Sequence, residues 1–123
     1  MPEIHYAPAD EADISFTITG DGEIPLIWTL GYVSHLDVNW DFLLFRRFSE
    51  ALGEFCRLIV YDKRGTGRSA GEYTFDFHQL ARDAVEAVRL LRTRPEIDAE
   101  RIGLAGYSQG GWVAPLAASL CED

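Results

Sequence analysis

The chain has 123 residues, 47% of them hydrophobic, and this length predicts one domain, residues 1–123, that buries roughly two-thirds of the surface of the unfolded chain. Twenty Asp and Glu against eleven Lys and Arg give a net charge of −9, which disfavours nucleic acid and anionic membranes as partners. The first residues lack the basic and apolar segments of a secretion signal, and no stretch approaches the ~20 apolar residues of a membrane span. These features predict a cytoplasmic protein without nucleic-acid or membrane partners.

Hydrophobic patterning predicts four strands. Residues 13–19 alternate between apolar and polar side chains, which is typical of a strand with one face in solvent. Residues 25–30 and 56–61 are short apolar runs, as expected for central strands covered by helices on both faces. Residues 101–106 form the last predicted strand. Because the later strands alternate with helical segments, we expect an α/β fold with a mostly parallel sheet flanked by helices.

Three helices are expected between and after these strands. Asp41 can cap the first, whose apolar residues recur at three- and four-residue steps up to Gly53 and predict a buried stripe. That stripe consists of Phe42, Phe45, Phe48 and Leu52. Asp76 begins the second, a crossover helix that must end before Pro95. The third is predicted over residues 109–120.

A short motif separates the last strand from the last helix. Residues 106–110 are Gly-Tyr-Ser-Gln-Gly and match the pattern G-x-S-x-G. A serine hydroxyl is a weak nucleophile, so it must be exposed on a tight turn where a base can reach it. Gly106 and Gly110 lack the Cβ atoms that would collide there, and Ser108 is therefore predicted to be a catalytic nucleophile. The alternative is that the glycines only allow close helix packing and that Ser108 is incidental.

Two backbone N–H groups are expected to stabilise an oxyanion beside Ser108. One belongs to Gln109, at the start of the last helix, where the helix dipole is positive. The other is expected from Tyr32, with Val33 as the alternative, because Gly31 allows the chain to turn sharply after the second predicted strand.

Residues 62–69, Asp-Lys-Arg-Gly-Thr-Gly-Arg-Ser, follow a predicted strand and invite comparison with a nucleotide-binding loop. Their glycine spacing is one residue away from the dinucleotide pattern, and the next helix begins only near Asp76, so nucleotide binding is disfavoured. We expect the glycines to form turns, Asp62 and Arg64 to fix the loop by hydrogen bonds, and Lys63 to be solvated.

Two segments, LIVYDKRGTGRS at 58–69 and RIGLAGYSQGGWVAPLAAS at 101–119, resemble the first half of α/β-hydrolases, particularly esterases and acyl-peptidase-like members. LGYVSHLDVNWD at 30–41 is similar to hydrolase domains found alongside some nucleotide cyclases. The resemblance covers nearly the whole chain. It implies acyl transfer from small-molecule esters, thioesters or amides by Ser108, with Gln109 and Tyr32 as oxyanion donors and no cofactor.

The catalytic acid and histidine of that family follow later strands, and no residue of this chain matches either. The chain contains His5, His35 and His78. His35 is the best placed of them to act as a base, because its loop should open at the same sheet edge as Ser108. No metal site is predicted, since the spacing of His35, Asp37 and Asp41 fits no usual ligand pattern.

In the complete fold of that family the strand at 101–106 is paired on both sides, so one of its edges is expected to be bare in this chain. We therefore predict either a homo-oligomer that pairs along this strand or a separate chain that supplies the missing half. A catalytically inactive fragment or interaction module is the alternative to a serine hydrolase, and the sequence does not identify the substrate.

Overall fold

Five strands form one mixed sheet in the computed structural model, which describes residues 2–31 and 35–121. The strands are β1 (His5–Ala9), β2 (Ala12–Thr19), β3 (Ile24–Thr29), β4 (Cys56–Tyr61) and β5 (Gly103–Gly106). Their order across the sheet is β1-β2-β4-β3-β5, with β4, β3 and β5 parallel and the pairs β1·β2 and β2·β4 antiparallel. The α/β class predicted from the sequence is confirmed, although the sheet is mixed because β2 runs antiparallel to both of its neighbours.

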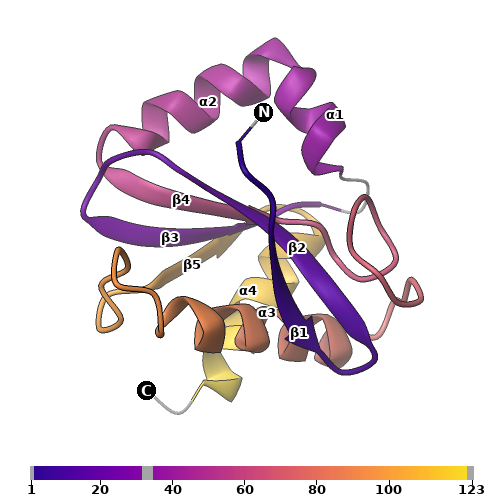
Figure 1. The fold of residues 1–123 in the computed structure, drawn as a ribbon. Helices are drawn as coiled ribbons and strands as arrows, with labels where there is room; N and C mark the ends of the chain where they lie inside the picture. The colour runs from indigo at the N-terminus through magenta and orange to yellow at the C-terminus, as the bar shows by residue number, and fades with distance from the viewer. Residues whose placement is uncertain (1, 32–34, 122–123) are drawn as a thin grey trace.

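Helices cover both faces of the sheet (Figure 1). The two short helices α1 (Leu36–Asp41) and α2 (Leu43–Gly53) lie on one face, and α3 (Phe77–Leu91) and α4 (Gln109–Leu120) lie on the other. Strand β4 explains why a central strand must be apolar throughout. Ile59 and Tyr61 belong to the core beneath α3 and α4, whereas Leu58 and Val60 belong to the core beneath α1 and α2.

All four predicted strands are present, and β1 is an additional strand that patterning did not predict. It is short, and only its central residue Ala7 is buried. Pro8 lies within it opposite Asp13 of β2. Proline cannot donate a ladder hydrogen bond and is confined to edge strands, which is the position that β1 occupies.

The first predicted helix differs from the structure at its start. Asp41 ends α1 rather than capping α2, and Phe42 lies between the two helices in an extended conformation. The predicted buried stripe is therefore only partly correct: Phe45 and Leu52 pack against the core, but Phe42 is 61% exposed and Phe48 41% exposed. The side chain of Phe42 leaves the stripe because its backbone is not helical, and the Phe48 ring packs against Trp28 with their centroids 5.2 Å apart.

The second predicted helix begins and ends as expected. The Asp76 carboxylate accepts hydrogen bonds from the backbone N–H groups of His78 and Gln79, at 3.0 and 3.4 Å. The Gln79 side chain donates to Asp83 instead of returning to the cap, so the capping box is only half formed. The helix ends at Leu91, before Pro95.

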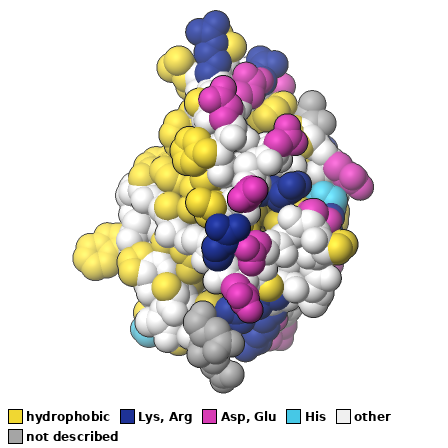
Figure 2. All heavy atoms as spheres, turned by 90° about the vertical axis from the view of Figure 1, so that its left-hand side faces the viewer, with side chains coloured by type: hydrophobic (Ala, Val, Ile, Leu, Met, Phe, Trp, Pro, Cys, Tyr) yellow, Lys and Arg dark blue, Asp and Glu magenta, His cyan; other side chains and the backbone are white. Residues whose placement is uncertain are grey.

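Strand β5 pairs with β3 alone in the part of the chain that the structure describes, so its outer edge is free as expected. Large apolar side chains are exposed around it, including Tyr107 at 51% and Trp112 at 71%. Figure 2 shows a broad band of hydrophobic side chains across the left part of this view, next to a mixed charged surface. Burying such a surface against another polypeptide is favourable.

Candidate active site

Ser108 occupies the turn between β5 and α4, at the carboxyl end of the parallel strands. Its backbone has φ 53° and ψ −125°, a conformation that residues with a Cβ rarely adopt. The residue is exposed. Strain of this kind persists only where the surrounding structure enforces it, and it commonly marks functional residues. The turn therefore presents the Ser108 hydroxyl to the outside, as the motif requires.

Close backbone contacts explain why glycines flank this turn. A Cβ on Gly106 would lie 2.4 Å from the Gly110 carbonyl oxygen, and one on Gly110 would lie 2.1 Å from the Thr29 carbonyl oxygen. Any other residue at either position would force β3, β5 and α4 apart. The glycines thus hold the serine turn against the end of β3.

Of the expected oxyanion donors, the structure describes only Gln109. Gln109 begins α4 and is buried, and its side-chain Oε1 has no hydrogen-bond partner among the described residues. Tyr32 and its alternative Val33 lie outside the described residues. Gly31, immediately before them, is close to the turn, since a Cβ built on it would lie 3.6 Å from the Ser108 Cβ. The loop that begins at Gly31 therefore starts beside the serine turn.

Two residues that follow β4 hold both ends of this loop. Lys63 donates a hydrogen bond from Nζ to the Gly31 carbonyl oxygen. The Asp62 carboxylate accepts hydrogen bonds from the backbone N–H groups of Leu36 and Arg68, each at 2.9 Å. We call this arrangement the loop clamp. It fixes the chain on either side of residues 32–34.

The position of Lys63 corrects the sequence prediction, because the side chain is 1% exposed rather than solvated. Burial lowers the pKa of Lys63, and the Asp62 charge opposes that change. Burial likewise raises the pKa of Asp62, while its hydrogen bonds from Arg68 and Leu36 oppose that change. The signal in the sequence was the position of these residues at the carboxyl end of β4, the strand beside β3.

A pH titration of stability tests this burial. Between its lowered pKa in the folded chain and its ordinary value of 10.5, Lys63 binds fewer protons when folded than when unfolded. The free energy of unfolding contributed by this group must therefore rise with pH in that window. Urea unfolding from neutral pH upward should show that the free energy of unfolding of the wild type, minus that of Lys63→Met, rises with pH. A parallel pH dependence of the two proteins would contradict the buried ammonium.

An independent control uses the fact that Lys63 is the only lysine in the chain. An amine-reactive reagent should modify it in the unfolded protein and spare it in the folded protein, as read by peptide mass. Equal modification in both states would mean that Lys63 is solvated in the folded protein, as the sequence predicts.

The remainder of the 62–69 loop is fixed by its own contacts. Arg64 forms a two-point ion pair with Asp83, at 2.7 Å for each nitrogen, and also donates to the Asp10 carbonyl oxygen. Gly65 and Gly67 have positive φ; a Cβ on Gly65 would lie 2.2 Å from the Tyr73 backbone nitrogen, and one on Gly67 would lie 2.0 Å from Asp62 Oδ2. These glycines form turns as predicted.

The histidines do not complete a catalytic pair within the described residues, where no hydrogen bond joins any of them to Ser108. His35 precedes α1, and its buried Nδ1 has no hydrogen-bond partner among the described residues. His5 stacks on Phe16 in the core. His78 is exposed in the first turn of α3. No group of three His, Cys, Asp or Glu that could hold a metal occurs in residues 2–31 and 35–121.

Aromatic side chains form an apolar surface next to the serine turn. Trp28 lies between Phe48 and Tyr107, with ring centroids 5.2 and 6.0 Å apart. Tyr107 precedes Ser108, so these rings adjoin the serine turn. Of the helices in the described part of the chain, none has the length and apolar character needed to cross a membrane.

A strained serine in G-x-S-x-G, between a parallel strand and a helix, defines the nucleophile turn of α/β-hydrolase folds. Residues 28–122 match the model described as the alpha/beta hydrolase family, and the chain belongs to that family. Thiohydrolase apmlB of Arthrinium phaeospermum is 39% identical to this chain over 64 residues, which are 50% of this chain and 21% of the relative.

Solved structures agree with this fold. An alpha/beta hydrolase fold protein from Chitinophaga pinensis matches all of this chain and 41% of its own length, with 25% identity and a TM-score of 0.76. Esterase Pf2001 of Pyrococcus furiosus matches 93% of this chain and 44% of its own length, with 24% identity and a TM-score of 0.74. The chain thus spans less than half the length of these relatives.

Proposed function

We propose that this chain carries the nucleophile of a serine hydrolase that cleaves small-molecule esters, thioesters or amides. The observation that carries the proposal is the exposed Ser108 at φ 53°, held in the G-x-S-x-G turn by close backbone contacts at Gly106 and Gly110. The name of the 39% identical thiohydrolase favours thioesters among these substrates.

The proposed reaction has two steps. Ser108 Oγ attacks the substrate carbonyl carbon while a base takes its proton, and the alcohol, thiol or amine leaves with that proton as an acyl-serine forms. Water then attacks the acyl-serine and releases the acid. The Gln109 N–H at the start of α4 and a second N–H from the loop after Gly31 are proposed to stabilise the oxyanion in both steps.

The base and the acid are proposed to come from polypeptide outside the described residues. No histidine contacts Ser108 in that part of the chain, and the outer edge of β5 and the apolar surface beside it are uncovered. Relatives with the same fold are more than twice as long as the matched region. A further segment or a second chain, including a second copy, that pairs with β5 would bring its residues next to Ser108.

Intact mass after incubation with a fluorophosphonate tests the nucleophile. In this reaction a serine Oγ displaces fluoride from phosphorus, so the chain should gain one adduct, and Ser108→Ala should gain none. Labelling of the isolated chain should be slow, because the oxyanion hole without a base retains only a small part of the activity. No adduct on a chain with native circular dichroism would contradict the proposal and favour a non-catalytic module.

Imidazole in the buffer tests where the base comes from. If the isolated chain lacks a base, free imidazole should accelerate labelling of Ser108 several-fold relative to buffer of equal ionic strength. If His35 is the base, imidazole should have little effect and His35→Gln should abolish labelling. His78→Gln is the matched control, because that exposed side chain lies on α3.

A further inference from the structure

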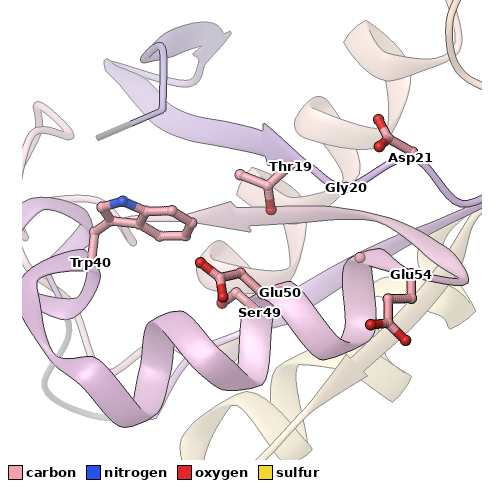
Figure 3. A pocket seen from close by; sticks show the side chains of 8 residues that line it. Thr19, Gly20, Asp21, Trp40, Ser49, Glu50 and Glu54 are labelled. Atoms are coloured by element: carbon pink, nitrogen blue, oxygen red, sulfur yellow. The ribbon is translucent and has the colours of Figure 1, made fainter.

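A pocket of about 370 Å³ lies between α2 and the end of β2, away from the serine turn, and we call it the α2 pocket. Its lining residues are Thr19, Gly20, Asp21, Trp40, Ser49, Glu50, Gly53 and Glu54. Neither the serine turn nor the loop clamp contributes to it. Its volume is within the range of small-molecule sites. Figure 3 shows the Glu50 carboxylate pointing toward the Trp40 ring, with Ser49 next to it on α2.

The charge of the α2 pocket is one-sided. Asp21, Glu50 and Glu54 line it, and no Lys, Arg or His does. Among the described residues, none of these three carboxylates forms an ion pair. Carboxylates gathered in a hollow without a counter-charge favour a bound cation.

Ser49 provides an independent sign of a ligand. The residue is 2% exposed, and its Oγ has no hydrogen-bond partner in the described structure although it lines the pocket. A buried hydroxyl without a partner is unfavourable, and almost all such groups in folded proteins are paired. A ligand that donates a hydrogen bond to Ser49 would remove this cost.

Trp40 distinguishes between kinds of cation. An indole ring attracts an organic ammonium over its face but offers no oxygen ligand to a hard metal ion. A quaternary ammonium ion has no N–H group, so it could not donate a hydrogen bond to Ser49 or Glu50. We propose that the α2 pocket binds a small primary alkylammonium ion, with the cation between Trp40 and Glu50 and one N–H donated to Ser49.

The test is a titration of the ¹⁵N-labelled 123-residue chain with n-butylammonium chloride, followed by NMR. The Trp40 indole N–H, assigned with Trp40→Phe, should shift with saturation. The n-butanol analogue, which has the same chain without the charge, and sodium chloride at equal ionic strength should not reproduce the shift. Shifts that fail to saturate, or that n-butanol reproduces, would overturn the proposal.

Variants locate the cation. Glu50→Gln should weaken binding about tenfold, equivalent to about 1.4 kcal/mol, because it removes the opposing charge. Glu72→Gln, a charge-matched change at an exposed residue outside the pocket, should leave binding unchanged. Equal affinity of Glu50→Gln and wild type would overturn the assignment.

Ser49→Ala separates a ligand contact from a structural role. The variant should bind n-butylammonium several-fold more weakly while its unfolding temperature without ligand stays the same or rises, since the lost hydroxyl has no partner in the described structure. Unchanged affinity would remove Ser49 from the site. These readouts do not involve Ser108, so they stand or fail separately from the proposed hydrolase activity.

Discussion

Gly110→Ala is expected to destabilise the fold by about 3 kcal/mol or more, because the new Cβ must displace backbone rather than a flexible side chain. That Cβ would lie 2.1 Å from the Thr29 carbonyl oxygen and 2.8 Å from that of Leu30. Moving α4 away from β3 would also move Ser108 away from the loop that begins at Gly31. Urea unfolding measures the loss, and fluorophosphonate labelling should fall with it.

The neighbouring glycine is a matched control. A Cβ on Gly111 would meet only the Gly106 carbonyl oxygen at 3.7 Å, an ordinary contact. Gly111→Ala should therefore stabilise the chain by about 0.5–1 kcal/mol, as alanine does in a helix interior. If both alanine variants changed stability alike, the close approach of α4 to β3 would not be what Gly110 provides.

Arg64→Met is expected to cost about 3–5 kcal/mol, because it leaves the Asp83 carboxylate buried without its opposite charge. The two side chains are 9% and 2% exposed, and both guanidinium nitrogens of the pair lie 2.7 Å from a carboxylate oxygen. The pair connects the loop after β4 to α3, so its loss should loosen the 62–69 loop. The measurement is the free energy of unfolding in urea.

A surface pair and a double variant serve as controls for this prediction. Arg89→Met removes the partner of Glu86 on the exposed side of α3 and should change stability by about 1 kcal/mol or less. Arg64→Met combined with Asp83→Leu removes both charges and should recover much of the loss. A double variant as unstable as Arg64→Met would show that lost packing, not the unpaired charge, causes the effect.

The same loop after β4 serves two purposes in this fold. Arg64 anchors it to α3, while Asp62 and Lys63 reach across to the loop beside Ser108. A change in the 62–69 loop is therefore expected to alter the surroundings of Ser108 without contacting it. This arrangement gives a physical reason for a cluster of charged residues in the interior of an otherwise apolar core.

Local pattern determined the strands, the helix cap and the serine turn of this protein. Periodicity located β2, β3, β4 and β5, because alternating and continuous apolar runs are typical of strands. The prediction that one face of β2 lies in solvent was wrong, since Ser15 and Thr17 on its polar face are buried. Asp76 was predictable because its role as a helix cap depends on residues only a few positions away. The motif around Ser108 was also predictable, but the close contact of Gly110 with the Thr29 carbonyl oxygen was not.

Features that depend on distant segments were decided by the tertiary structure alone. The sequence predicts that Lys63 is a surface charge. In the structure it is buried, because β4 ends beside β3 and the Gly31 carbonyl oxygen accepts its hydrogen bond. The sequence predicts that Phe42 is buried, but the break between α1 and α2 exposes its side chain. The α2 pocket joins residues of β2, α1 and α2 that no motif connects. A sequence specifies each residue's chemistry, whereas the charge and burial around it arise only when remote segments pack together.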